Sequence, residues 1–496
     1  MRLLFHLLIG AVAMIGGAGV VAAGPKPLNV VLILADDLGW TDLSCYGSDL
    51  YQSADIDSLA RDGMRFTANY SACTVCSPTR AALLTGKYPA RLHITDWIPG
   101  LPPENPKLIV PDFTKQLPLE ETTIANVLHD AGYATASIGK WHLGGPKFYP
   151  EHHGFDLNVA GTDQPQPRPG YFAPYAMDTI EQGSKGEYIT DRLGEEAVQF
   201  VRANAGRPFF LYLPHFAVHT PIQGKKKLVD RYQARVHDGM RHTNAAYAAM
   251  IDSMDQTVGR IRTTLDELGI ADHTIIIFTS DNGGRIPTTS NAPLRAGKGS
   301  CYEGGVRVPL IVYWPNVTKA GSECAAPVIT MDLFPTILEM TRTAGTGASS
   351  VDGLSLAPLL RQTGDLPERP LFWHYPHYQH YQLEGTTPYA AIRRGDNKLI
   401  EFYEDNRVEL YNERDDIGER NNIADSSPQL VKSLQDELHA WLRAVDAQMP
   451  TPNPNYDPSK PEHATAPARS AADIRARHSV SQRDSVDADR LTFNQR

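Results

Sequence analysis

The sequence predicts an α/β protein with a large, mixed but mostly parallel sheet and flanking helices, followed by a small C-terminal α+β unit with an antiparallel sheet. Apolar runs typical of strands buried on both faces, beginning with 29–35 (NVVLILA), alternate with segments of helical periodicity. Polar clusters directly follow several of these runs, as sites do at the carboxyl edge of a parallel sheet. Beyond the proline-rich hinge at 367–370, short β-like pieces and one helical pattern replace this alternation.

The elements of the large unit are expected in a regular order. Helices are predicted where apolar residues recur every three or four positions, at 122–131, 189–204 and 247–268. Later strands are predicted at 133–138, 208–214, 275–280 and 308–314. In the C-terminal unit we expect short antiparallel strands between 389 and 411 and a helix at 428–445.

Four regions follow from the composition of the chain. Residues 1–23 have a basic start, an apolar run and a small-residue end, which predicts a cleaved secretory signal peptide and an exported protein without stable membrane insertion. A signal anchor is the alternative, because the apolar run approaches membrane-spanning length. We expect the large domain at 24–370, the C-terminal unit at 371–450 and a disordered, proline-containing tail at 451–496.

Charge and cysteine content limit the function classes. The chain has 496 residues and a net charge of −10, which argues against a nucleic-acid partner because such a partner requires a basic face. If Cys76 has a chemical role, four cysteines remain, and they can pair in three ways: Cys45, Cys73, Cys301 and Cys324. Export permits disulfides, but a chain of this size does not need them, so both disulfides and free thiols stay open.

The segment 76–86 (CSPTRAALLTG) presents a reactive side chain at the expected start of a helix. Ser77 is a favourable N-cap and Gly86 a favourable helix end. Cys76 is therefore expected just ahead of the helix N-terminus, where the macrodipole favours an anion, and Arg80 adds a guanidinium near the same place. This segment is suited to an anionic substrate.

Two other interpretations of this cysteine are weaker. A cysteine at a helix N-terminus can be a thiolate nucleophile, and Cys73 with Cys76 gives the CxxC spacing of a redox pair or half of a zinc site. The sequence has no second CxxC to complete a zinc site, and nothing beyond the spacing supports dithiol chemistry.

Oxygen-bearing side chains directly follow two of the expected strands. Asp36 and Asp37 come after the first strand, and Asp281 and Asn282 come after the strand at 275–280. Each pair alone is ordinary turn chemistry. Taken together, four hard oxygen ligands without a thiol or imidazole suit Ca²⁺ or Mg²⁺ rather than zinc.

Cationic and imidazole side chains occupy similar loops. Lys140 and His142 (GKWH) follow the strand at 133–138, and His219 (HTP) comes after the strand at 208–214. Lys298 lies between two glycines and has a weaker local signal. A solvated loop lysine is the alternative for Lys140. Nothing else in the sequence selects His152, His153 or His215.

The Cys-x-Pro-x-Arg motif at 76–80, together with Asp-Asp, Gly-Lys-x-His, His-Thr-Pro and Asp-Asn-Gly, resembles the signature of the sulfatase family. The resemblance covers 28–445 and implies an alkaline-phosphatase-like fold and calcium-dependent hydrolysis of sulfate esters. Within the family the chain is most similar to the arylsulfatase A-like group, and its LGWTDL and TDWIP stretches resemble bacterial carbohydrate sulfatases. One departure is Lys87, where the family often has arginine, which can weaken recognition by the maturation enzyme.

The resemblance also implies a role for each motif residue. Cys76 would be oxidised to formylglycine by a separate formylglycine-generating or sulfatase-maturating enzyme, and the hydrated aldehyde would be the nucleophile. His219 would protonate the leaving oxygen, and His142 would take the proton from the remaining hydroxyl so that sulfate leaves. The cations implied to hold the sulfate and the formylglycine diol are Arg80, Lys140 and Lys298. The implied calcium ligands are Asp36, Asp37, residue 76, Asp281 and Asn282.

The natural substrate is expected to be a sulfated carbohydrate, with a galactose-type sugar as the working hypothesis. Aromatic residues at 373–378 and at Tyr171, Phe172 and Tyr175 are more simply interpreted as packing between the two units than as a sugar platform. Two alternatives stay open. One is a phosphodiesterase or phosphonate monoester hydrolase of the same fold, and the other is a catalytically silent protein that binds sulfated glycans.

Overall fold

The computed structural model describes residues 26–101, 103–343, 351–379 and 386–460. The expected signal peptide at 1–23 lies outside the described residues, as does most of the expected tail, 461–496. Within the described part of the chain, none of the helices has both the length and the apolar character that crossing a bilayer requires.

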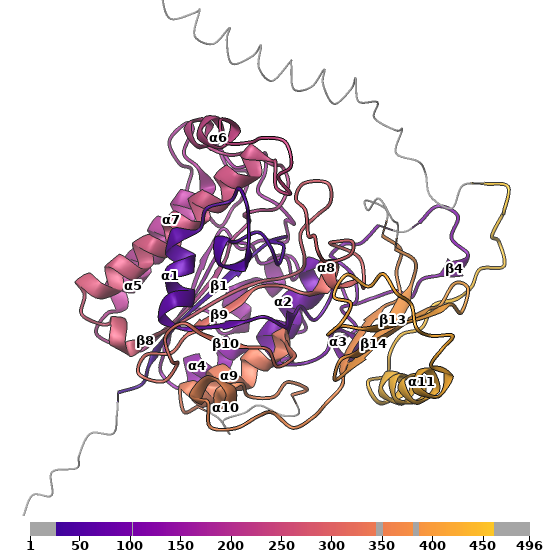
Figure 1. Cartoon of the computed structure of the whole chain (residues 1–496). Coiled ribbons are helices and arrows are strands. Elements are labelled where there is room, and N and C mark those ends of the chain that lie inside the picture. The colour runs from indigo at the N-terminus through magenta and orange to yellow at the C-terminus, as the bar shows by residue number, and fades with distance from the viewer. Residues whose placement is uncertain (1–25, 102, 344–350, 380–385, 461–496) are drawn as a thin grey trace, which may run out of the picture.

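A central eight-stranded sheet forms the body of the molecule (Figure 1). Every pairing is parallel except those of β9, which runs antiparallel to both of its neighbours, so the sheet is mixed but mostly parallel as predicted. The predicted strand at 308–314 therefore forms, but with the opposite direction to the others. In spatial order the strands are β10 (Ser322–Cys324), β2 (Met64–Phe66), β9 (Leu310–Tyr313), β8 (Thr274–Ser280), β1 (Asn29–Ala35), β7 (Phe209–Pro214), β5 (Ala134–Ile138) and β6 (Leu157–Val159).

Strand β1 is buried on both faces because alternate side chains point into two separate cores. Val31 and Ile33 belong to one core and Leu32 and Leu34 to the other, and full burial of each such side chain contributes about 1.5–3 kcal/mol. Helices cover both faces (Figure 1). The first core includes α1 (Ala54–Asp62), α5 (Ile189–Asn204) and α7 (Ala245–Glu267). The second includes α2 (Cys76–Thr85), α4 (Ile124–Asp130), α9 (Leu333–Met340) and α10 (Ala357–Arg361).

The helix boundaries follow local capping chemistry. A capping box between Thr123 and Asn126 starts α4, and the Asn244 side chain accepts a hydrogen bond from the Tyr247 N–H to start α7. Helix α2 ends at Gly86, whose φ of 72° is a left-handed conformation that glycine adopts without steric cost. The predicted helices at 122–131, 189–204 and 247–268 are confirmed within a few residues.

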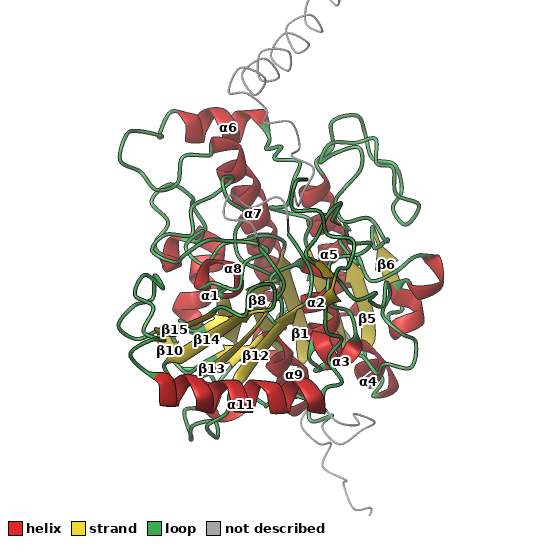
Figure 2. Cartoon of the chain, turned by 90° about the vertical axis from the view of Figure 1, so that its right-hand side faces the viewer, coloured by secondary structure: helices red, strands yellow, loops and turns green. Residues whose placement is uncertain are grey.

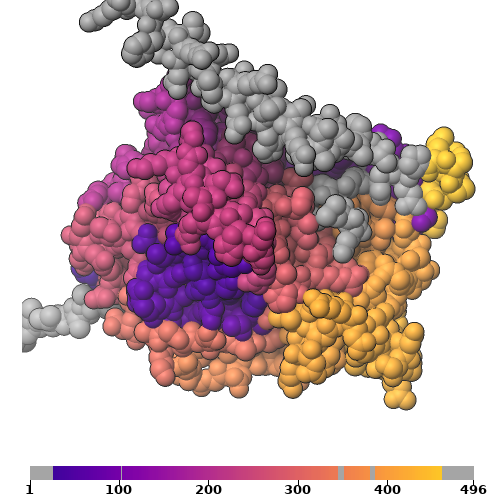
Figure 3. Space-filling model, turned by 45° about the horizontal axis from the view of Figure 1, so that its top comes forward, coloured from indigo at the N-terminus to yellow at the C-terminus, as the bar shows by residue number. Residues whose placement is uncertain are grey.

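The C-terminal unit is a four-stranded antiparallel sheet covered by one helix, as predicted (Figure 2). Its elements are β12 (Leu371–Tyr375), β13 (Tyr389–Arg394), β14 (Asn397–Phe402), β15 (Val408–Asn412) and α11 (Pro428–Ala444). The buried Trp373 donates a hydrogen bond from Nε1 to the Ser71 carbonyl, and Tyr375 donates from its hydroxyl to Asp96. These aromatic residues therefore pack between the two units, which form one continuous surface (Figure 3).

Residues 451–460 differ from the expectation of a disordered tail. Strand β16 (Thr451–Pro452) pairs with β4 (Leu108–Ile109), and the Asn453 N–H donates to the Lys107 carbonyl at 2.9 Å. Placing the tail boundary at 451 is therefore wrong for its first ten residues. Backbone pairing requires no large apolar side chains, which is why the composition did not indicate it.

Short elements complete the described chain. They are α3 (Pro89–Leu92), α6 (Lys226–Gln233), α8 (Glu303–Val306), β3 (Asn69–Tyr70), β11 (Val328–Ile329) and the 3₁₀ turns Ser44–Tyr46, Pro146–Phe148, Pro150–His153, Ala271–His273 and Thr330–Asp332. All five cysteines are free thiols, so none of them forms a disulfide bond in this structure.

Candidate active site

Four neighbouring strands deliver the predicted polar side chains to one edge of the sheet. Strand β1 lies between β7 and β8, and β5 lies beyond β7. Asp36 and Asp37 follow β1, and Asp281 and Asn282 follow β8. The loops after β5 and β7 bring the lysine and the two histidines to the same edge. The grouping of loops expected from the sequence is thus present in the structure.

The four oxygen-bearing side chains form one buried cluster. The Asp37 N–H donates to Asp281 Oδ1 at 3.2 Å, and Asn282 Nδ2 donates to Asp37 Oδ1 at 2.9 Å. Asp36 Oδ1 and Asn282 Oδ1 are buried and have no hydrogen-bond partner within the described chain. Leaving such atoms unsatisfied costs about 1–3 kcal/mol each, and a hard cation satisfies them. The donor set therefore fits Ca²⁺ or Mg²⁺.

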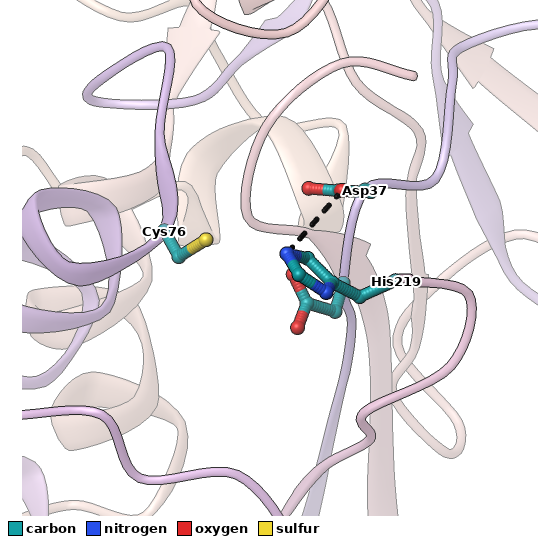
Figure 4. A group of neighbouring side chains, drawn as sticks. Asp37, Cys76 and His219 are labelled. Carbon is teal, nitrogen blue, oxygen red and sulfur yellow. Dashed lines mark ion pairs between the residues drawn. The ribbon is translucent and has the colours of Figure 1, made fainter. Parts of the chain in front are cut away.

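Cys76 lies beside this cluster. Ligand atoms of Asp36, Asp37, Cys76 and His219 all lie within 4.8 Å of one another. Figure 4 shows Cys76, at the start of helix α2, and His219, on a loop, facing the same space; His219 Nε2 lies 3.8 Å from Asp37 Oδ2. The position of the expected nucleophile and the oxygen cluster therefore form a single site.

Three buried cations surround the oxygen cluster. Arg80 donates two hydrogen bonds to Asp281 Oδ2, at 3.1 and 2.8 Å. Lys140 Nζ lies 2.6 Å from Asp36 Oδ2. Lys298 Nζ lies 2.6 Å from an Asp37 oxygen and 3.5 Å from Cys76 Sγ. Three cations balance three carboxylates, so a divalent cation makes the site net positive and suited to an anion.

Lys140 has its position because a glycine precedes it. Gly139 has a φ of 129°, and a β-carbon there would collide with the Pro214 carbonyl oxygen. That same oxygen accepts the Lys140 N–H at 2.7 Å, which ties the loop after β5 to the end of β7. The backbone approaches so closely that only glycine fits at 139.

Burial and neighbouring charges shift the ionisation of the site. Burial raises the pKa of the Cys76 thiol to about 11, although Lys140 and Lys298 partly oppose this. Burial and the nearby Asp36 raise the pKa of Asp281 to about 6 against the effect of Arg80. The unmodified thiol is therefore neutral near pH 7, which disfavours the thiolate interpretation.

The start of helix α2 differs in detail from the prediction. Cys76 is the first helical residue, Val75 occupies the N-cap position, and Ser77 makes no capping hydrogen bond. Instead, Ser77 Oγ donates to the His142 carbonyl at 3.0 Å and accepts the Ile98 N–H at 3.1 Å. Tertiary hydrogen bonds have overridden the N-cap preference of serine, and Ser77 holds the histidine loop.

His142 is a buried, neutral imidazole with a defined tautomer. Its Nε2 faces the Ile98 carbonyl, which can only accept, so Nε2 carries the hydrogen. Nδ1 is buried and has no partner among the described residues, which leaves its lone pair available as a base. Burial and the charge of Lys140 hold the pKa of His142 well below its usual range.

His219 is held by its backbone and has a partly exposed side chain. The Tyr171 hydroxyl donates to the carbonyls of Phe216 and His219, and His219 Nδ1 lies 2.8 Å from the Thr220 carbonyl. Nδ1 therefore carries a hydrogen and Nε2 faces the site. Burial and Lys298 lower the pKa of His219 to about 3, so it is neutral before an anion binds.

The sequence did not single out the residues that support the metal-ligand loop. Asp37 has a left-handed backbone with a φ of 62°. The Tyr247 hydroxyl lies 3.0 Å from the Asp37 carbonyl and 2.7 Å from Asp42 Oδ2. The buried Asp42 also accepts hydrogen bonds from the Gly39 N–H and the Thr289 hydroxyl. Tyr247 has the spacing of an ordinary helical core residue, so no sequence signal marks this contact.

This arrangement has the chemistry of an ester hydrolase acting on a tetrahedral oxyanion. Residues 28–343 match the family model described as Sulfatase, and residues 297–448 match the model described as N-sulphoglucosamine sulphohydrolase, C-terminal. The chain belongs to the sulfatase family. The predicted family and fold class are confirmed, whereas the roles of individual residues stay predictions.

Known proteins with similar sequences are sulfatases. A sulfatase of Formosa agariphila is 35% identical, and the match covers 85% of this chain and 89% of that protein. The N-acetylgalactosamine-6-sulfatase of Canis lupus familiaris is 33% identical over 388 residues, with 73% and 71% coverage.

Solved structures extend the comparison to the fold. The crystal structure of Ps i-CgsB is 30% identical, has a TM-score of 0.72 and covers 85% of this chain and 94% of that one. It has also been solved in complex with k-i-k-neocarrahexaose, an oligosaccharide. The phosphonate monoester hydrolase of Agrobacterium radiobacter, at 21% identity and a TM-score of 0.63, shares the fold, with 84% and 95% coverage.

Proposed function

We propose that this protein is an exported, calcium-dependent sulfatase that hydrolyses sulfate esters of carbohydrates with a nucleophile made from Cys76. One observation carries the proposal: Cys76 Sγ lies 3.5 Å from Lys298 Nζ, in the same buried cluster as Asp36 and Asp37. A carbohydrate substrate is supported by the similarity to N-acetylgalactosamine-6-sulfatase and to a structure that contains an oligosaccharide.

The metal site supports calcium through its ligands. Asp36, Asp37, Asp281 and Asn282 would hold the ion, and two of their buried oxygens otherwise lack partners among the described residues. When bound, calcium supplies positive charge that offsets the charge of the sulfate ester.

Modification of Cys76 would have to precede folding. Cys76 is 2% exposed, so a formylglycine-generating or sulfatase-maturating enzyme cannot reach its side chain in the folded chain. As formylglycine, residue 76 would supply a hydrated aldehyde as the nucleophile. Export through a signal peptide at 1–23 is compatible with modification of the unfolded chain.

Three cations would bind the sulfate and orient it. Lys140 contacts the metal ligand Asp36, Lys298 contacts Asp37, and Arg80 is bound to Asp281. Positioned charges of this kind act strongly because the site is buried and needs no reorganisation during the reaction.

The two histidines would move protons in opposite directions. His219 would donate from Nε2 to the leaving oxygen, since a bound sulfate anion favours protonation of that nitrogen. His142 would accept a proton at Nδ1, the nitrogen left without a partner while Nε2 donates to Ile98. The alternative phosphodiester and binding-only functions use the same pocket, so kinetics must separate them.

The test compares three substrate classes on protein produced in a host that matures sulfatases. We expect 4-nitrophenyl sulfate to be hydrolysed far faster than bis-4-nitrophenyl phosphate, and the Cys76→Ala variant to lose this activity. A faster phosphodiester reaction would contradict the sulfatase proposal. Binding of a sulfated glycan without any turnover by matured protein would favour the silent binding protein instead.

A further inference from the structure

A groove with a volume of about 630 Å³ opens at the carboxyl edge of the sheet beyond β5 and β6. This lateral groove has the size typical of ligand sites, about 300–1,000 Å³. The roles described above for the metal, sulfate and protons do not involve its polar lining. The polar residues that line it are Tyr149, Thr162, Asp163, Gln164, Tyr175, Asp178 and Gln182.

The lateral groove lies next to segments that hydrogen-bond to the backbones of the two proton-transfer histidines, His142 and His219. The His142 N–H donates to the Thr162 carbonyl at 2.9 Å, so one wall starts at the active-site loop itself. The Tyr171 hydroxyl donates to the His219 carbonyl at 2.8 Å, and the chain from there to residue 182 supplies another wall. These two hydrogen bonds attach the walls of the lateral groove to the loops that carry His142 and His219.

The chemistry of the lateral groove is opposite to that of the sulfate site. Its lining includes no lysine, arginine or histidine. Asp163 and Asp178 have no cationic partner in the described part of the chain. Both lie near Tyr149, and burial together with these two carboxylates raises the pKa of Tyr149 to about 12. Gln164 Nε2 donates to Asp163 at 3.2 Å, while its Oε1 is buried without a partner among the described residues.

These groups select for hydroxyl donors and against anions. Carboxylate and amide oxygens accept hydrogen bonds from sugar hydroxyls, and a carboxylate acceptor gives the stronger, charge-assisted bond. A sulfate or uronate group at the same place would face like charge without a compensating cation. The groove therefore discriminates by charge as well as by hydrogen bonding.

We propose that the lateral groove binds an uncharged sugar residue next to the sulfated one. The inference rests on the proposed carbohydrate sulfatase function and narrows it: the protein acts on oligosaccharides in which the neighbouring sugar is neutral. Asp163 and Asp178 would bind hydroxyls of that neighbour, and they take no part in the reaction at Cys76.

The experiment measures kcat/KM for three substrates. They are 4-nitrophenyl sulfate, singly sulfated disaccharides from a panel of galactose, glucosamine and fucose, and the same disaccharides with a second sulfate on the neighbouring sugar. Wild type is compared with the Asp163→Asn, Asp178→Asn double variant. A control variant with the same charge change, Asp425→Asn, Asp436→Asn, alters two exposed carboxylates of the C-terminal unit.

We expect the double variant to lose about tenfold in kcat/KM on the preferred singly sulfated disaccharide, mainly through KM, since two charge-assisted hydrogen bonds are weakened. Activity on 4-nitrophenyl sulfate should stay within about twofold, and preference for the singly over the doubly sulfated disaccharide should shrink. The control variant should match wild type on all substrates.

Other results overturn the groove proposal and are distinct from failure of the sulfatase proposal. An equal loss on 4-nitrophenyl sulfate would show that the two carboxylates support the active site and not a sugar. An unchanged preference between disaccharides, or aryl sulfate turnover without turnover of any disaccharide in the panel, would also overturn it while leaving the sulfatase activity in place. Absence of aryl sulfate turnover in matured wild type would instead contradict the proposed function.

Discussion

Removing the Tyr247 hydroxyl should weaken calcium binding although Tyr247 is not a ligand. In Tyr247→Phe the ring stays in the core, and only the hydroxyl that contacts the Asp37 carbonyl and Asp42 is lost. The contact matters because Asp37 adopts a left-handed backbone, which costs a residue other than glycine about 1–2 kcal/mol. The hydroxyl helps to hold Asp37 in that conformation before the ion arrives.

The expected change in calcium affinity follows from two energies, that of the Tyr247 hydrogen bond and that of the left-handed Asp37 backbone. A hydrogen bond to a neutral carbonyl such as that of Asp37 contributes about 0.5–1.5 kcal/mol, which is comparable to the cost of the left-handed backbone. Without the hydroxyl, the binding-competent loop is only partly populated in the calcium-free protein, and the apparent affinity falls by the same fraction. We expect the calcium Kd to rise about tenfold, or about 1.4 kcal/mol.

Calorimetric titration of chelator-treated protein with CaCl₂ measures this Kd directly. Tyr51→Phe is the matched control, because it removes a buried hydroxyl that contacts Thr289 in the same aromatic cluster but does not touch Asp37. The control should bind calcium like wild type, and Tyr247→Phe should recover most of its activity at saturating calcium. Equal Kd values for the two variants would refute the reasoning about the Asp37 backbone.

Three further predictions concern proton transfer, a buried ion pair and acid stability. His219→Ala should lower kcat on an alkyl sulfate by about 10²–10⁴-fold, but only slightly on 4-nitrophenyl sulfate, whose leaving group needs no proton; an equal loss on both substrates would remove its role as the acid. Lys398→Met should destabilise the protein by about 3–5 kcal/mol in denaturant unfolding, because two buried glutamates lose their shared cation, whereas the exposed Lys432→Met should cost about 0.5 kcal/mol or less. Burial lowers the pKa of His374 from 6.5 to about 4, against a hydrogen bond to a backbone carbonyl that raises it. Between pH 4 and 6.5 the unfolded chain therefore binds more protons at His374 than the folded chain does. The contribution of His374 to the free energy of unfolding is complete above pH 6.5 and is lost as the pH falls toward 4. This loss is on the order of 3 kcal/mol. Urea unfolding between pH 4 and 7 should accordingly show a flatter pH dependence for His374→Gln than for wild type, and parallel curves would contradict this.

Sequence patterns predicted the fold well where burial leaves a strong periodic signal. The continuous apolar run of β1 and the three- and four-residue spacing of α7 reflect the cores that these elements contact, so both were located within a few residues. The direction of β9 could not be predicted in this way, because an apolar run reports burial and not chain direction. The pairing of β16 (Thr451–Pro452) with β4 was missed for a related reason, since backbone hydrogen bonds leave little trace in composition.

The candidate site could be predicted from the sequence where a motif residue directly follows a strand. Asp36 and Asp281 follow neighbouring parallel strands, so the topology alone brings them together. Supporting contacts were not predictable. Ser77 has the sequence context of a helix cap but holds the His142 loop, and Tyr247 acts through one hydroxyl on a helix that otherwise packs in the core. Such roles depend on which distant backbone group lies within reach, which local sequence does not specify.

Residue 76 is proposed to be a nucleophile made from cysteine. Trypsin cleaves after Arg65 and Arg80, so the peptide 66–80 carries both Cys73 and Cys76. Its mass and fragment ions, measured on protein from a host that matures other sulfatases, should show an aldehyde at 76 and an unmodified thiol at 73. An unmodified Cys76 in protein that hydrolyses aryl sulfates at full rate would contradict the account.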